Sequence, residues 1–130
     1  MSAARTASHE RLKTVLRRGL SVLYLVAGVL HLVMPEPFLT ITPAWVPYPA
    51  LAIALTGVLE IMGAVGLMSQ RFRKIAGLAL AAYAVCVFPA NINHAMQDFA
   101  SANGGLGWWY HAPRLALQPI LVWAAYYCSR

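Results

Sequence analysis

Charged residues are scarce in this sequence. Asp, Glu, Lys and Arg make up 11% of the 130 residues and apolar residues 60%, whereas an average soluble domain is about a quarter charged. So few charges cannot cover a water-facing surface, which argues against a soluble enzyme and against a disordered chain. The formal net charge of +6 would suit nucleic acid, but the basic residues border long apolar runs instead of lining one face, so no nucleic-acid partner is expected.

Cysteine is also scarce. Cys86 and Cys128 lie far apart and form no CxxC pair, so neither a disulfide framework nor a thiol redox centre is expected. The chain also lacks the alternation of polar and apolar residues that a membrane β-barrel requires. What remains is a set of long, uninterrupted apolar runs.

These runs predict an all-α integral membrane protein, a four-helix bundle. A membrane-spanning helix needs about 20 mostly apolar residues, and four segments approach this length. They run from about Val15 or Gly19 to Met34, from Pro49 to Met68, from Ile75 to about Ala95, and from about Pro113 to Tyr127. We therefore predict a basic N-terminal segment over residues 1–18 and one four-helix transmembrane domain over residues 19–130.

The basic residues predict the orientation. Apart from Arg114, every Lys and Arg lies before the first run, between the second and third runs, or at the C-terminus. The connections Pro35–Pro49 and Met96–Ala112 contain none. This bias places both termini in the cytoplasm of a multi-pass protein of the inner (cytoplasmic) membrane, with the basic segment on lipid headgroups.

Ionisable and amide side chains inside apolar runs are the candidate functional residues, because they are costly in hydrocarbon and therefore face the bundle interior. Glu60 lies about ten residues from the outer end of its run, roughly 15 Å deep. The other polar residues fall in the outer half of their runs. The predicted ligand-binding set is His31, Glu60, Asn91, His94, Arg114 and Gln118.

Spacing along the helices indicates that this set converges. Asn91 and His94 are three residues apart and Arg114 and Gln118 four, so each pair shares a helix face. The face of Glu60 carries small residues such as Gly57 and Gly63, which allow neighbouring helices to approach closely. We therefore expect Glu60 to be surrounded by protein.

The same stretches resemble the DoxX-like family of small membrane proteins. The resemblance covers roughly residues 18–127 and has one motif per helix. The motifs are Ala27-Gly28-Val29-Leu30-His31, Thr56-Gly57-Val58-Leu59-Glu60-Ile61-Met62-Gly63, Phe88-Pro89-Ala90-Asn91 and Arg114-Leu115-Ala116-Leu117-Gln118, with a proline-rich stretch after the first. The resemblance implies a four-helix membrane fold. Some members of the family are quinone-reducing subunits, others are partners of redox enzymes, and others are receptor assembly factors.

The polar set is compatible with a site for a quinone or another small amphipathic molecule, as in a redox-associated subunit. Imidazole, amide and guanidinium groups can donate to quinone oxygens, and Glu60 could relay the protons that reduction needs. We predict that Glu60→Gln or Arg114→Ala impairs binding more than Cys86→Ala or Cys128→Ala. These residues fit binding as well as catalysis, so enzymatic activity remains open.

Three other interpretations remain. Glu60 could pair with Arg114 or a histidine and only fix the bundle in register. His31 and His94 could bind haem or a metal with Glu60 as a carboxylate ligand, but the sequence contains no HxxxH or ExxH pair, so we predict no metal. Finally, the chain could be a non-catalytic partner or assembly subunit of a larger membrane or redox complex, or a homo-oligomer, with a small-residue face such as Gly77-xxx-Ala81 as its interface.

Overall fold

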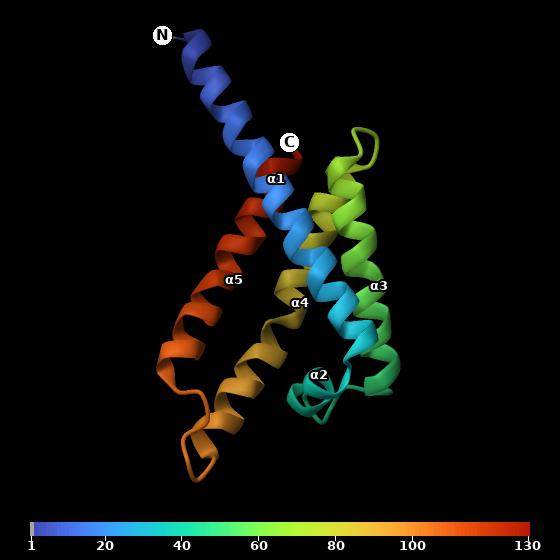
Figure 1. Ribbon diagram of the computed structural model, residues 1–130, viewed down its shortest axis with the longest axis vertical. Helices are drawn as coiled ribbons and strands as arrows, with labels where there is room; N and C mark the ends of the chain where they lie inside the picture. The colour runs from blue at the N-terminus through green and yellow to red at the C-terminus, as the bar shows by residue number, and fades with distance from the viewer. Residues whose placement is uncertain (1) are drawn as a thin grey trace.

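The protein is all-helical, as predicted. A computed structural model describes residues 2–130 and contains helices throughout, with no strand in that range (Figure 1). The helices are α1 (Ser2–Val33), α2 (Glu36–Ile41), α3 (Pro49–Met68), α4 (Arg73–Ala100) and α5 (Trp108–Ser129). Four are long, and α2 is a six-residue helix in the connection between α1 and α3.

Three of the described helices, α1, α3 and α4, are long and apolar enough to cross a membrane. This indicates a multi-pass membrane protein. α5 has 22 residues but is not one of the three, because Arg114, Gln118 and two internal prolines lower its apolar content. Residues 2–130 thus form five helices with three candidate spans, whereas the sequence predicted four spanning helices.

The four long helices form a ring. α1 packs against α3 and α5, and α4 packs against the same two helices from the other side. The start of α1, the α3–α4 turn and the end of α5 lie toward one end of the molecule, at the top of Figure 1, whereas α2 and the α4–α5 turn lie toward the other. Below, these are the terminal end and the α2 end.

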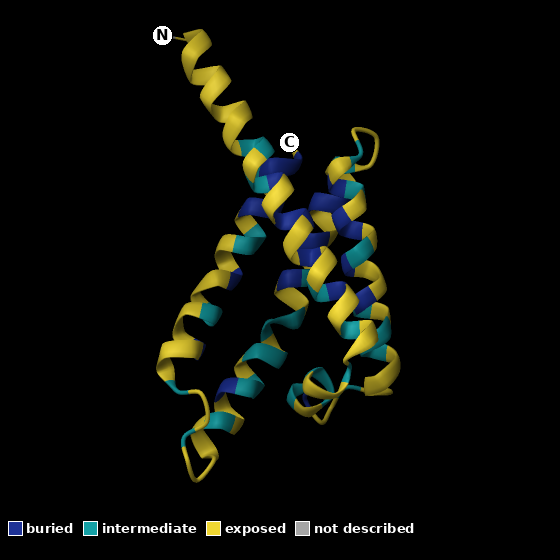
Figure 2. Ribbon diagram, viewed as in Figure 1, coloured by how far each residue is buried: buried dark blue, intermediate teal, exposed yellow. Residues whose placement is uncertain are grey.

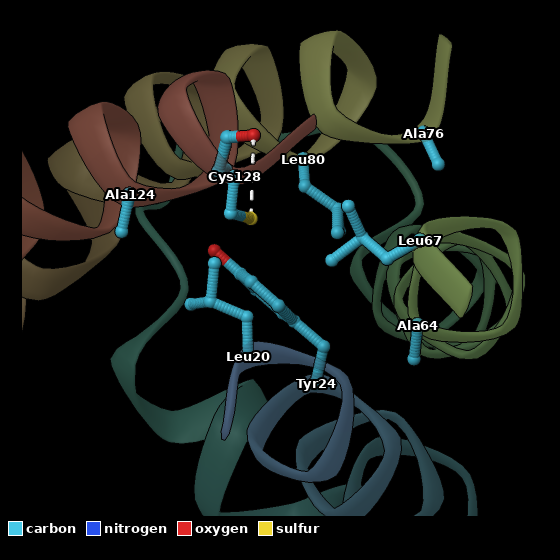
Figure 3. Close-up of a cluster of buried hydrophobic side chains, with 9 residues drawn as sticks. Leu20, Tyr24, Ala64, Leu67, Ala76, Leu80, Ala124 and Cys128 are labelled. Carbon is cyan, nitrogen blue, oxygen red and sulfur yellow. Dashed lines mark hydrogen bonds between the residues drawn. The ribbon is translucent and has the colours of Figure 1, made fainter. Parts of the chain in front are cut away.

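The terminal end is the more tightly packed half. Buried positions gather where α1, α3, α4 and α5 meet there (Figure 2). Figure 3 shows the core, in which Tyr24 of α1 points between α4 and α5 toward Cys128, beside Leu67 and Leu80. Large apolar side chains elsewhere, such as Val26 and Val65, face outward, as expected for helices in contact with lipid.

The predicted basic segment, residues 1–18, is helical and continuous with the first span, because α1 runs unbroken from Ser2 to Val33; Met1 lies outside the described residues. Arg17, which we expected at lipid headgroups, is buried, and its Nε and Nη2 donate to the Cys128 carbonyl at 3.1 and 2.9 Å. Arg17 thereby caps the C-terminal end of α5, where backbone carbonyls lack helical partners.

Candidate functional site: two polar clusters on one cavity

Two glycines bring α1 and α3 into backbone contact. A Cβ atom on Gly28 would lie 2.6 Å from the Gly57 carbonyl oxygen, and one on Gly57 would lie 2.9 Å from the Gly28 carbonyl oxygen. Only residues without a side chain permit so close a crossing. His31 and Glu60 follow these glycines by three residues, about one turn, so the crossing places them opposite each other.

His31, Glu60 and Tyr83 form the first polar cluster. Nδ1 of His31 lies 2.8 Å from the Ala27 carbonyl oxygen and 2.7 Å from Oε2 of Glu60. A carbonyl oxygen only accepts, so Nδ1 carries a proton and donates to Ala27, which leaves Nε2 as the second nitrogen of the ring. On the other side, the Tyr83 hydroxyl donates to Oε1 of Glu60 at 2.7 Å.

Arg114 is the centre of the second cluster. Its Nη1 donates to Nδ1 of His94 at 2.7 Å, and its Nη2 donates to Oδ1 of Asn91. The guanidinium also lies 5.5 Å from the centre of the Tyr110 ring. Within residues 2–130 no carboxylate lies within ion-pair distance of Arg114, so neutral groups hold this cation.

Both clusters border one cavity of about 880 Å³, which is within the usual range for small-molecule sites. It is lined by His31 of α1, Glu60 of α3 and Tyr83 of α4. It is also lined by Asn91 of α4 and by Arg114 and Gln118 of α5. Toward the α2 end it is bordered by Phe38, Ile41, Thr42, Pro43, Trp45 and Val46. The cavity therefore has a carboxyl group and a guanidinium group among mostly apolar walls.

Two buried polar atoms on this cavity lack a partner among the described residues, namely Oε1 of Gln118 and the Tyr24 hydroxyl. These two residues are only 8% and 4% exposed. Because buried polar groups are nearly always paired, each such atom needs an explanation, such as a bound molecule or water.

The structure places the predicted set as follows. His31, Glu60, Asn91, Arg114 and Gln118 line the cavity. His94 does not line it, but contacts it through Arg114. Glu60 pairs with His31, and the described residues contain no Glu60–Arg114 pair, so the expected single cluster is instead two. His31 and His94 fall in different clusters and do not share one site.

Sequence reasoning missed Tyr83 and Phe38. Tyr83 supplies the donor to Glu60, and the only signal for it is a lone hydroxyl within an Ala-rich and Val-rich run. Phe38 stacks on His31 with ring centres 3.8 Å apart, a contact made by the unpredicted helix α2. The expected small-residue interface is also used internally, because Gly77 packs directly against Ser129 of α5.

Comparison with known sequences places the chain in a family. The model of the family described as "Domain of unknown function (DUF8561)" matches residues 20–129. The chain belongs to this family. No curated protein and no solved structure matches the chain. The family match spans α1 from Leu20 onward and α2 to α5 up to Ser129, and it includes the residues of both polar clusters.

Proposed function

We propose that this protein is a DoxX-like, four-crossing protein of the inner membrane that binds a quinone or a similar small amphipathic molecule in the cavity, as a redox-associated subunit. Both termini lie in the cytoplasm in this proposal, and the α2 end faces the outer leaflet. The observation that carries it is the set of buried polar atoms without partners on an otherwise apolar cavity.

The chemistry of the two clusters matches a molecule with polar atoms at opposite edges of a ring. Arg114 and Gln118 offer donors on the α5 side of the cavity. On the other side, Glu60 is held between His31 and Tyr83, so a proton at the carboxylate has two neighbours able to exchange it. Apolar walls such as Leu59 and Leu121 suit a hydrocarbon ring or tail.

An alternative is a membrane partner or assembly subunit whose buried polar residues are structural. One observation favours it: the His31–Glu60 and Arg114–Asn91 contacts each join two helices, as a device that fixes helix register would. A bundle held in this way needs no ligand. The two interpretations differ in whether the cavity takes up a small molecule.

Tryptophan fluorescence distinguishes the ligand-binding interpretation from the structural one. Trp45 borders the cavity, and a quinone bound there should quench its emission. We expect a short-chain ubiquinone to quench detergent-solubilised protein saturably, with the saturable part absent in Trp45→Phe. Glu60→Gln and Arg114→Ala should weaken the affinity about 10- to 100-fold, because hydrogen bonds to charged groups contribute about 1.5–3 kcal/mol.

The matched controls are carboxylate and guanidinium changes at exposed sites. Glu36→Gln and Arg18→Ala should leave the affinity unchanged, since both side chains lie outside the cavity. Linear, unsaturable quenching in all variants would mean only partition of the quinone into detergent. That result, or equal affinity in Glu60→Gln and the unmodified protein, would contradict the proposal.

A further inference from the structure

A third group of side chains, which shares His94 with the second polar cluster, lies at the α2 end, where α4 finishes and α5 begins. His94, Asp98 and His111 each offer one ligand atom, and these atoms lie within 4.8 Å of one another. Nε2 of His111 lies 2.7 Å from Oδ2 of Asp98, and Nε2 of His94 lies 3.8 Å from Oδ1. The group does not border the cavity.

The α4–α5 turn is built around this group. Asp98 accepts the Leu106 backbone N–H at 3.0 Å, and Gly105 lies so close to the Asp98 carboxyl that a Cβ atom would collide with it. Gly105 also has a φ of 58°, which favours glycine. The turn therefore fixes the carboxylate between the two imidazoles.

His111 is completely buried, at 0% exposure, yet its Nδ1 has no partner among the described residues. Asp98 can only accept when ionised, so Nε2 of His111 carries the ring proton in the structure. Nδ1 is the open position to which that proton moves if Nε2 becomes a metal ligand. A buried imidazole that is held in one orientation and has one free nitrogen is better suited to be a metal ligand than a surface histidine is.

We infer that His94, Asp98 and His111 bind one divalent first-row transition metal ion, such as Zn²⁺. Two imidazoles and one carboxylate select this class over Mg²⁺ or Ca²⁺, which prefer oxygen ligands alone. Bonds of about 2.0–2.2 Å put tetrahedral ligand atoms about 3.4 Å apart, so shifts of about 1 Å would bring all three onto one ion. A fourth position remains for water.

Metal binding is coupled to Arg114. Nδ1 of His94 accepts from Arg114 in the structure, so its Nε2 carries the ring proton. When Nε2 binds a metal, this proton moves to Nδ1 and the hydrogen bond from Arg114 breaks. The guanidinium, which is also a competing positive charge, then leaves His94. Arg114 therefore weakens the binding of a metal ion at this group.

A Co²⁺ titration of the metal-stripped, full-length protein in detergent tests the inference by the visible absorption of bound Co²⁺. We expect one Co²⁺ per chain. Asp98→Asn and His111→Asn should each weaken binding at least about ten-fold, since loss of even an outer-shell partner of a metal costs about 10–100-fold. His9→Asn, at the opposite end of the molecule, should not change it.

Arg114→Ala supplies the readout that a purely structural cluster would not give. It should strengthen Co²⁺ binding, because it removes both the competing donor and the positive charge. Retained helical content, measured by circular dichroism, identifies the variants that fold. If His111→Asn does not fold, Asp98→Asn alone supplies the test of lost Co²⁺ binding. No Co²⁺ bound by the unmodified protein, or equal affinity in Asp98→Asn, would overturn the inference.

Discussion

Gly28 and Gly57 control the site although neither carries a functional group. Their crossing sets the distance between α1 and α3, and that distance decides whether His31 reaches Glu60. The sequence indicates this role, because each glycine precedes a polar residue by three positions on the same face. The sequence alone does not pair one glycine with the other, since any two small faces could have met.

We predict that Gly28→Ala destabilises the protein by about 1–3 kcal/mol, the usual cost of an added group in a packed contact. The new Cβ would lie 2.6 Å from the Gly57 carbonyl oxygen, so α1 and α3 must separate. Thermal unfolding in detergent, followed by circular dichroism, measures the change.

Gly19→Ala is the matched control for this substitution. Gly19 lies on the same helix, and a Cβ atom there would meet nothing within 4 Å. It should leave stability unchanged or raise it by about 0.5–1 kcal/mol through helix propensity. Equal losses in the two variants would contradict the assigned crossing.

At the scale of elements, the apolar runs predict the helices well. The run from Pro49 to Met68 has the bounds of α3, because prolines before it and charged residues after it mark both ends. The other long helices extend beyond their apolar runs, as α4 does to Ala100. Hydropathy marks the part suited to lipid, whereas helical hydrogen bonding continues into polar sequence.

The parts of the site that could not be predicted come from contacts between elements. α2 begins after Pro35, contains Pro37 and is too short to give a periodic signal, yet it supplies Phe38 and borders the cavity. Asp98 and His111 lie in a predicted connection. Their only signal is the four-residue spacing of His94 and Asp98, and the partner from α5 depends on how the turn folds.

Whether α5 crosses the membrane is a question that accessibility can answer. We predict that it does, because it completes the ring with α1 and α4. In a background of Cys86→Ala and Cys128→Ala, a membrane-impermeant maleimide should label Asn103→Cys in intact cells. Ser69→Cys and Arg130→Cys should be labelled only after permeabilisation.

The position of Arg130 decides between four and three crossings. If α5 lay on the outer surface, Arg130→Cys would be labelled in intact cells together with Asn103→Cys, while Ser69→Cys remained protected. That pattern would contradict the fourth crossing. Protection of Asn103→Cys in intact cells would instead contradict the proposed orientation.

At the scale of the whole molecule, the two ends differ in construction. The terminal end is closed by small residues and leucines, with Arg17 bound to the last turn of α5. The α2 end contains the cavity, both polar clusters and the His94–Asp98–His111 group. A tightly packed half holds the helices together, so the other half can remain hollow and carry buried polar atoms.

Native mass spectrometry of gently extracted protein tests this account most directly. We predict that the chain carries a bound molecule with the mass of an isoprenoid quinone, and that its occupancy falls strongly in Glu60→Gln but not in Glu36→Gln. A folded protein that carries no small molecule after gentle extraction, or one whose occupancy is the same in both variants, would contradict the account.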